Sequence, residues 1–475
     1  MSTAVALRES YDLAVIGAGP AGLAAAAKAA RLGVDTVLLD EQSSPGGQIY
    51  RAITETPLRD RSILGADYWR GADLTASIGD SGVQYVANAS VWSVSRECEI
   101  GVSIGNVARI IRARRAILAT GAMERPFPIP GWTLPGVMTA GAAQILLKSS
   151  GLVARNRVVL AGTGPLLWLI AAQYLRAGAE IAALLDTTPR ENWREALPHL
   201  PAFLASSYFR KGLGLLREVR VRVPVIRDVQ SLRAIGDDRV REVAYRTRDG
   251  AERRMPVDHL FLHQGVAPNI NLANSIGCGH SWSETQLCFV PVVDEWGEST
   301  VEGIAISGDG AGIGGAEAAA QRGFLAGLDA ACRLGRIDRT RRDREATANR
   351  QALRRAERGR AFLDLLYRPR ISDRIPEGAT LACRCEEVTA QQISDTVALG
   401  CTGPNQMKSF LRCGMGPCQG RLCGLTVTEL IARARGVSPG EVGYYRLRPP
   451  IKPITLEELA GLPKTDAAVK AVVRG

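Results

Sequence analysis

Lysine, histidine and aromatic residues are scarce in this 475-residue sequence. Only seven of its 59 basic residues are lysine, and they are spread along the chain rather than gathered beside aromatic residues. The formal net charge of +11 therefore does not indicate a nucleic-acid-binding surface, because no recognition module accompanies the charge. We expect no nucleic-acid ligand. We expect the abundant arginines on solvated faces, some of them facing an acidic partner.

Apolar runs of membrane-spanning length are also missing, with one partial exception. Residues 158–175 carry no charge, but they contain Gly162 and Gly164 where a strand should turn into a helix. The stretch therefore predicts a buried strand and helix rather than a membrane span. Residues 1–8 lack the apolar core of a secretory signal peptide. We expect a cytoplasmic protein, with peripheral association at the inner membrane as an open alternative.

Redox-active cysteine pairs and metal-binding histidine patterns are absent from the first 333 residues. No C-x2-C or C-x4-C element occurs there, which disfavours disulfide reductase chemistry. The histidines lack metal-ligand spacing and are assigned no role. These histidines are His199, His259, His263 and His280. The cysteines without a pairing pattern, expected to be small core residues, are Cys98, Cys278, Cys288, Cys332 and Cys401.

The chain opens with an apolar strand, a glycine turn and an alanine-rich helix. Residues 11–16 read as the strand, residues 17–22 have the pattern G-x-G-x-x-G, and residues 21–32 read as the helix. A second apolar strand at residues 36–39 completes a βαβ unit of about thirty residues. We predict dinucleotide binding at this unit. The alternative is a glycine-rich turn of purely structural use.

Each residue of the turn has a physical role in this prediction. Gly17 allows the tight turn, Gly19 lets the backbone approach a pyrophosphate, and Gly22 lets the helix pack closely on the strand. The phosphate charge then meets the positive end of the helix dipole. Pro20 and Ala21, which open the helix, are predicted to border the cofactor as well.

An acidic residue follows the second strand. Asp40, eighteen residues beyond Gly22, is placed to accept a hydrogen bond from a ribose hydroxyl. Glu41 is the alternative if the strand ends one residue later.

Two later segments favour FAD over NAD as the dinucleotide. Residues 116–122 form an apolar strand that ends in a small-residue turn, and residues 304–310 form another that delivers a carboxylate beside glycines. Asp309 is predicted to accept hydrogen bonds from a ribityl chain, although alone it could be a turn former. The helix expected after Gly315 would point its N-terminus at the isoalloxazine. The residues predicted to contact FAD here are Thr120, Gly121, Gly308 and Asp309.

A second nucleotide-like unit lies between these segments. A strand at residues 158–161 leads into a turn with Gly162 and Gly164, and a later strand ends in Asp186. The third glycine position holds Leu167, which should crowd the contact between helix and strand. Two interpretations remain open: the unit binds NAD(P), or it is structural or holds another nucleotide. We prefer the structural unit or the other nucleotide.

These patterns predict an α/β fold with two Rossmann-like dinucleotide-binding domains, the second inserted in the first, and a small, mainly helical 2Fe-2S domain after them. Residues 333–374 contain fourteen arginines and six acids, which suits a partly amphipathic helical connector. The predicted parts are the FAD-binding domain (1–125 and 271–333), the inserted NAD(P)-like domain (126–270), the connector (334–374), the cluster domain (375–440) and a C-terminal tail (441–475).

The predicted cluster domain is rich in cysteine. Cys383 and Cys385 lie on a short loop before a helix that should open at Thr389, and Cys418 and Cys423 lie in a glycine-rich loop before an apolar helix. Loops at helix N-termini stabilise a negative, thiolate-bound cluster. We predict a 2Fe-2S site held by these four cysteines. The alternatives are a structural zinc on the same thiolates, a disulfide pair, or free thiols. Cys413 is a fifth candidate, expected to be a buried or spare thiol.

Several segments carry a family resemblance. Residues 11–25, 45–51, 123–132, 412–423 and 448–453 resemble the A (alpha) subunits of heteromeric opine oxidases. The same group includes the B subunit of hydrogen cyanide synthase and the alpha subunit of D-hydroxyproline dehydrogenase. The similarity extends over nearly the whole chain.

This resemblance implies FAD in a pyridine-nucleotide-disulfide-oxidoreductase-like fold, with Gly47 and Gln48 among its contacts. It also implies a 2Fe-2S domain of the bacterioferritin-associated ferredoxin type, whose two ligand pairs match the four cysteines and leave Cys413 outside. The implied partners are a beta subunit similar to amino-acid oxidases, often a small ferredoxin-like gamma subunit, and an acceptor such as a quinone.

The leading hypothesis is therefore an electron-transfer subunit of an oxidoreductase acting on CH–NH bonds of an opine or amine, with the substrate oxidised in the beta subunit. No residue of this chain is predicted to act as a catalytic acid, base or nucleophile. The alternatives are a self-contained NAD(P)H-dependent flavin and iron–sulfur reductase and a non-catalytic assembly module.

Overall fold

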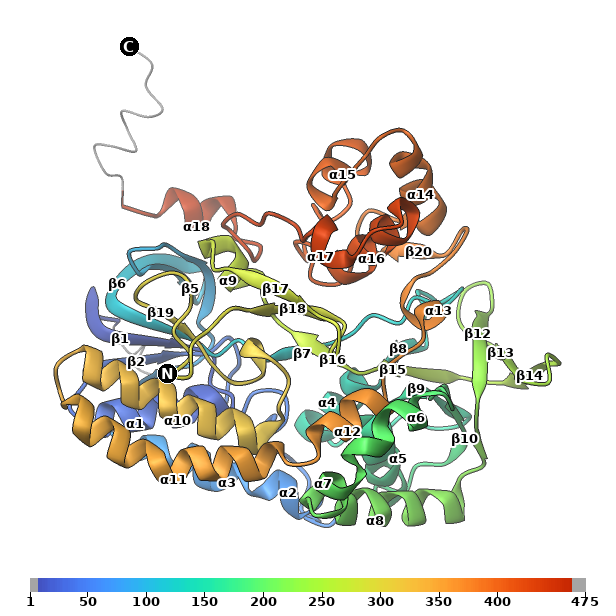
Figure 1. Cartoon of the computed structure of the whole chain (residues 1–475), viewed down its shortest axis with the longest axis horizontal. Helices are drawn as coiled ribbons and strands as arrows, with labels where there is room; N and C mark the ends of the chain where they lie inside the picture. Colours follow the sequence, from blue (N-terminus) through green and yellow to red (C-terminus); the bar gives the residue numbers. More distant parts are fainter. Residues whose placement is uncertain (1–6, 464–475) are drawn as a thin grey trace.

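The computed structural model describes residues 7–463 (Figure 1). Residues 1–6, most of the segment considered for a signal peptide, lie outside the described residues. So do residues 464–475 of the predicted C-terminal tail.

The first nucleotide unit is built on a seven-stranded sheet. Its order is β3-β2-β1-β6-β5-β4, with β19 paired to β6, and β3, β2, β1, β6 and β19 run parallel. Residues 13–16 of β1 and all of β2 are buried, which matches the mostly apolar sequence of these central parallel strands. The strands are β1 (Ser10–Ile16), β2 (Thr36–Leu39), β3 (Gln84–Val86), β4 (Ser90–Val94), β5 (Glu99–Ile104), β6 (Val107–Leu118) and β19 (Ile304–Ile306).

Helices α1 (Pro20–Arg31) and α10 (Ala316–Arg333) pack tightly against each other on this unit (Figure 1). Glycines make the contact possible, because a Cβ on Gly323 would lie 2.0 Å from the Ala21 carbonyl oxygen and one on Gly327 would lie 2.3 Å from that of Ala25. Two further helices, α2 (Ala66–Trp69) and α3 (Gly71–Gly79), follow the second strand in sequence.

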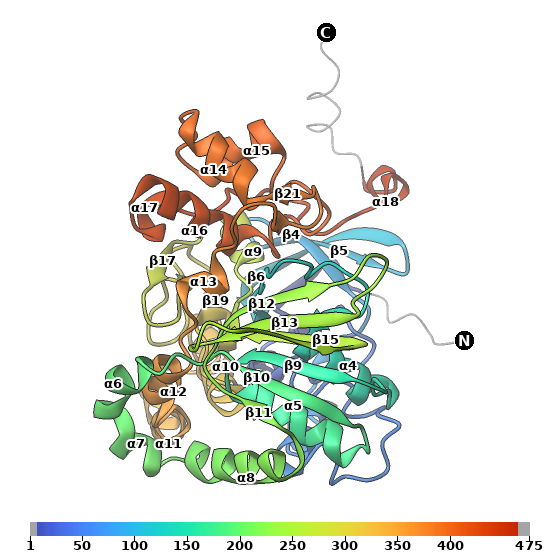
Figure 2. The same ribbon diagram turned by 90° about the vertical axis from the view of Figure 1, so that its right-hand side faces the viewer.

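The second nucleotide unit is a five-stranded parallel sheet in the order β11-β10-β9-β15-β8. Its strands are β8 (Val137–Thr139), β9 (Val158–Thr163), β10 (Ile181–Asp186), β11 (Val225–Ile226) and β15 (His259–Gln264). Its helices are α4 (Ala140–Ser150), α5 (Pro165–Arg176), α6 (Asn192–Ala196), η1 (Leu197–His199), α7 (Leu200–Leu204) and α8 (Ser207–Arg222). An antiparallel sheet of β12 (Val229–Ile235), β13 (Glu242–Thr247) and β14 (Glu252–Pro256) flanks it (Figure 2).

The chain crosses between the two units twice, and the two crossings pair as an antiparallel ladder of β7 (Ala122–Glu124) with β16 (Val266–Pro268). The second sheet therefore lies, in sequence, between β6 and β19 of the first. After the return come α9 (Asn271–Ile276), the hairpin of β17 (His280–Ser283) and β18 (Cys288–Pro291), and η2 (Gly308–Ala311).

The arginine-rich segment is helical, as expected. Helix α11 (Arg339–Glu357) packs on α10, and α12 (Arg360–Leu366) packs on α6 and α7, where Phe362 stacks on Phe203 with ring centroids 4.3 Å apart. A short helix, α13 (Ile371–Arg374), ends this segment.

The cysteine-rich region is mainly helical and lies at the end of the molecule opposite α8 (Figures 1 and 2). The expected capping box at Thr389 and Gln392 is present. The elements are β20 (Leu381–Cys383), β21 (Val388–Thr389), α14 (Ala390–Ala398), α15 (Pro404–Leu411), α16 (Gly424–Arg435), α17 (Pro439–Val442) and α18 (Leu456–Ala460). The α/β fold class with a helical C-terminal region is thus confirmed.

None of the helices within residues 7–463 is both long enough and apolar enough to cross a membrane. The uncharged stretch 158–175 forms β9 and α5, as predicted.

Candidate functional site

A cavity of about 1640 Å³ extends between the two nucleotide units and reaches the cysteine-rich loop. Most of the residues predicted to bind FAD line it. They are Gly17, Gly19, Pro20, Ala21, Asp40, Glu41, Gly47, Gln48, Thr120, Gly121 and Asp309. Gly22 and Gly308 do not line the cavity. Their missing side chains let neighbouring segments pack closely instead.

The glycine turn has the close contacts that its sequence predicts. A Cβ on Gly22 would lie 1.8 Å from the Gly17 carbonyl oxygen, and one on Gly17 would lie 2.4 Å from that of Ala119. By contrast, a Cβ on Gly19 would meet only the Gly47 Cα, at 3.8 Å. Helix α1 begins here with no side-chain cap. Gly19, Pro20 and Ala21 at its start line the cavity, a position that suits a phosphate.

The two candidate acids at the end of β2 are held differently. The Asp40 carboxylate accepts hydrogen bonds from the backbone N–H groups of Ala18 and Gln42, the latter at 2.8 Å. Burial raises the pKa of Asp40 despite these bonds. Glu41 lines the cavity and forms an ion pair with Lys452. Asp40 thus braces the turn, whereas Glu41 presents its carboxylate beside a cation from the C-terminal segment.

The two later segments meet at the far end of the same cavity. Thr120 Oγ1 donates to the Asn269 carbonyl oxygen at 2.9 Å. Asp309 Oδ1 accepts from the N–H groups of Gly314 and Gly315, both at 2.9 Å, at the start of α10. Asp309 therefore braces the N-terminus of α10 beside the cavity. Its predicted hydrogen bonds to a ribityl chain stay a prediction.

Several buried polar atoms on the cavity wall, Gln264 Oε1 among them, have no hydrogen-bond partner in the part of the protein that the structure describes. Arg51 Nε and Ser307 Oγ are buried, lack a hydrogen-bond partner there and line the cavity. A buried polar atom without a partner costs free energy, so the wall is built for a polar ligand. The donor set, the glycine cradle and the uncapped helix fit FAD.

Lys148 is a cavity residue that the sequence analysis missed. Its ammonium donates to the carbonyl oxygens of Gln48 and Ile49, at 3.2 and 2.9 Å, and to Gln144 Oε1 at 2.8 Å. It thereby holds the loop that carries Gly47 and Gln48 against helix α4. Burial, with repulsion from Arg51, lowers the pKa of Lys148 to about 7.

This shift predicts a pH dependence of stability. Between about pH 7 and 10 the unfolded chain keeps a proton on Lys148 that the folded chain has lost, so stability should rise with pH by up to about 1.4 kcal/mol per unit. The check is to measure thermal unfolding midpoints of the wild type and of Lys148→Met at pH 7, 8 and 9. The variant should lack the rise in stability that deprotonation of Lys148 gives. Equal pH slopes in the two proteins would contradict it.

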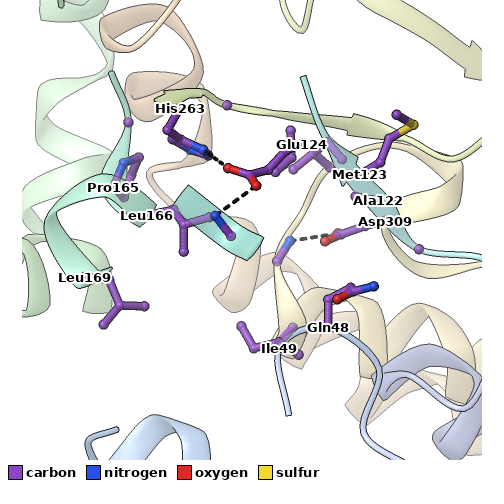
Figure 3. A pocket seen from close by; sticks show the side chains of 18 of the residues that line it. Gln48, Ile49, Ala122, Met123, Glu124, Pro165, Leu166, Leu169, His263 and Asp309 are labelled. Atoms are coloured by element: carbon purple, nitrogen blue, oxygen red, sulfur yellow. Dashed lines mark hydrogen bonds and ion pairs between the residues drawn. The ribbon is translucent and has the colours of Figure 1, made fainter. Parts of the chain in front are cut away.

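Glu124, which is partly exposed, and the buried His263 form a pair on the wall of the cavity (Figure 3). Glu124 Oε1 lies 2.7 Å from His263 Nδ1, and Glu124 Oε2 accepts from the Gly141 N–H at 2.8 Å. The sequence analysis gave His263 no role. His263 lies near the carboxyl end of β15, a parallel strand, and ligand sites gather at such strand ends.

The second glycine turn also borders the cavity, through Gly164, Pro165 and Leu166. Leu167 is buried in the core of the second sheet, and α5 begins regularly at Pro165. Asp186, at the end of β10, accepts from the N–H and hydroxyl of Thr188, at 2.9 and 2.6 Å, and burial raises its pKa.

The cysteine-rich region brings five thiols together. The sulfur atoms of Cys383, Cys413 and Cys423 are buried and lie within 4.8 Å of one another. Cys385 and Cys418 are hydrogen-bonded to each other beside them. Cys418 also lines the large cavity. The structure therefore brings one member of each predicted pair, Cys383 and Cys423, together with Cys413, which was expected to be a buried or spare thiol and is buried.

This environment suits a thiolate-bound metal centre. Hydrogen bonds from Cys413 and Cys423, and from the N–H groups of Gly414 and Glu386, lower the pKa of Cys383 to about 2. Backbone donors of this kind stabilise the negative charge of an iron–sulfur cluster. Which four thiols are ligands stays a prediction.

The fold and its cavity define a flavoprotein oxidoreductase with two nucleotide units. The pyridine nucleotide-disulphide oxidoreductase family matches residues 11–323, and the sarcosine oxidase A3 domain matches residues 379–462. More particularly, the chain belongs to the family of opine oxidase A subunits. The predicted family and the prediction of an oxidoreductase are confirmed.

Individual relatives agree with this assignment. The opine oxidase A subunit of Rhizobium meliloti is 47% identical, over 99% of this chain and 91% of its own length. Hydrogen cyanide synthase subunit HcnB of Pseudomonas aeruginosa is 31% identical, over 94% of this chain and 98% of its own. The crystal structure of L-proline dehydrogenase from P. horikoshii has the same fold, with a TM-score of 0.70 and 19% identity over 95% of this chain and 79% of that one.

Proposed function

We propose that this chain is the electron-transfer subunit of a heteromeric opine or amine dehydrogenase, with FAD in the large cavity and a 2Fe-2S cluster on the C-terminal cysteines. Substrate would be oxidised in a beta subunit similar to amino-acid oxidases. Its electrons would pass through this chain to a quinone or another carrier, and a small ferredoxin-like gamma subunit would complete the complex. The 47% identity to a protein named as one subunit of an opine oxidase supports the proposal.

One structural observation carries it: the cavity lined by the glycine turn is also lined by Cys418. FAD takes up two electrons together, whereas an iron–sulfur cluster passes them singly, so a shared wall suits exchange between the two. In this proposal Gly17, Gly19 and α1 bind the pyrophosphate. Asp309 orients the N-terminus of α10 toward the flavin. The proposed cluster ligands are Cys383, Cys385, Cys418 and Cys423.

The requirement for a partner is testable. Isolated chain, reconstituted with flavin and iron, should keep its yellow absorbance when an opine is added anaerobically, because in this proposal the substrate is oxidised in the beta subunit. The same chain with its beta subunit should be bleached. Absorbance near 450 nm, the usual region of flavin absorption, reports both results. Bleaching of the isolated chain would contradict the partner requirement.

A self-contained NAD(P)H-dependent reductase is the second candidate, and the contact of the second glycine turn with the same cavity favours it. Two features argue against NAD(P)H binding at this unit. Leu167 stands at the third glycine position of the turn. Tyr367 of the connector interacts electrostatically with the Asp186 carboxylate, which ends the second strand of the unit. We therefore propose that this unit is structural or holds another nucleotide. Rapid flavin reduction after stopped-flow mixing with NADH would favour the reductase. A colourless, metal-free protein would favour an assembly module.

We propose a cytoplasmic location, at the membrane only through the complex. Sedimentation of the assembled complex, but not of the isolated chain, with inner-membrane vesicles would support the second part of this proposal.

A further inference from the structure

The segment that follows the cysteine-rich helices crosses back over the first nucleotide unit (Figures 1 and 2). The Leu447 N–H donates to Asn274 Oδ1 at 3.2 Å, and the Ile451 N–H donates to the Trp92 carbonyl oxygen at 2.9 Å. Helix α18 then lies against β6. This C-terminal strap, residues 444–460, joins the cysteine-rich region to the unit that carries the glycine turn.

The strap brings a cation to the flavin cavity. Lys452 lines the cavity and pairs with Glu41, and only about a fifth of its side chain is exposed. Arg421, from the cysteine loop, lines the same wall, and its Nε donates to the Cys418 carbonyl oxygen at 3.1 Å. Burial acts to raise the pKa of Glu41, but Lys452 and then Arg421 lower it below its ordinary value.

Two cations thus face the acidic end of β2 from parts of the chain about 400 residues away in sequence. A purely structural strap would need the Ile451 and α18 contacts, but it would not need a lysine that opens onto a ligand cavity. The pyrophosphate of FAD is a dianion, and charge-assisted hydrogen bonds from lysine and arginine are the usual way to hold one.

We propose that Lys452 and Arg421 complete the FAD site from the C-terminal side, by binding the ribose–diphosphate half of the cofactor together with Glu41. This inference rests on the proposed function, which assigns FAD to the cavity. Because the same contacts fasten the cysteine-rich region to the first unit, FAD binding and docking of that region stabilise each other. Linkage makes the effect reciprocal.

The test uses the full chain and measures flavin affinity from the fluorescence of FAD released on dilution. Lys452→Met and Arg421→Met should each weaken FAD binding about tenfold to a hundredfold, the usual effect of removing a charge-assisted bond. Lys452→Arg should retain most of the affinity. Arg433→Met is the matched control, because Arg433 pairs with Glu377 at 2.7 Å on the surface of the same region and should leave affinity unchanged.

A second readout tests the coupling. FAD should slow tryptic cleavage after the exposed Arg446 in the wild-type chain, and it should protect less well in Lys452→Met. If both methionine variants bind FAD as tightly as the wild type, the inference is overturned while the proposed function stands. A wild-type chain that binds no FAD overturns both. Circular dichroism of each variant shows that a loss of affinity is not a loss of fold.

Discussion

Replacing Cys383 or Cys423 with serine should abolish the iron–sulfur centre. Both residues belong to the predicted ligand pairs and to the buried group of three sulfurs, so either change removes a thiolate from the predicted set and from that buried group. Iron content and the paramagnetic signal of the dithionite-reduced protein should fall to near zero. Cys401→Ser is the control, because Cys401 is buried in the same region and its Sγ donates to the Gly403 carbonyl oxygen at 3.5 Å.

The remaining three cysteines decide the ligand set. If the predicted set is right, Cys413→Ser keeps its iron, whereas Cys385→Ser and Cys418→Ser lose theirs. If Cys413 is instead a ligand together with Cys383 and Cys423, Cys413→Ser loses its iron. In that case either Cys385→Ser or Cys418→Ser keeps its iron. Zinc in place of iron in the purified protein would contradict the redox centre altogether.

Gly22→Ala should destroy the flavin site with a single methyl group. The added Cβ would lie 1.8 Å from the Gly17 carbonyl oxygen and 3.3 Å from the Ala119 Cβ, so either the turn or helix α1 must move. Overpacking of this kind costs about 1–3 kcal/mol, occasionally more. Movement of the turn also displaces the N–H groups that face the phosphate. We expect FAD affinity to fall at least about a hundredfold and the thermal midpoint to drop.

Gly79→Ala provides the matched comparison. Gly79 ends helix α3, and a Cβ there would meet nothing within 4 Å. Alanine is also the better helix former by about 1 kcal/mol, so this variant should be at least as stable as the wild type and bind FAD normally. Equal FAD retention by the two variants would show that the turn does not form the cofactor site.

The glycine turn and its close contacts could be predicted from the sequence because their determinants are local. A strand, a glycine turn and a helix lie within about thirty residues, and the close contacts at Gly17 and Gly22 depend on backbone sterics alone. The same holds for the capping box at Thr389 and for the segment that delivers Asp309, since each depends on neighbours a few residues away.

Other parts of the site depend on chain segments that only folding brings together. Glu124 and His263 are 139 residues apart and meet because β7 and β16 pair side by side. Lys148 reaches Gln48 across 100 residues, and no periodicity marks that contact. The location of Cys413 likewise depends on how its loop folds back over β20, which spacing between cysteines does not specify.

The sequence by itself therefore determined the α/β class of fold, the glycine turn and the mainly helical character of the cysteine-rich region, because short-range sterics and strand and helix patterns fix these features. The tertiary structure alone decided that the glycine turn and Cys418 line one cavity and that Lys452 pairs with Glu41. The physical reason is that such contacts arise from the packing of whole units, whose relative placement depends on many weak contacts summed over distant segments.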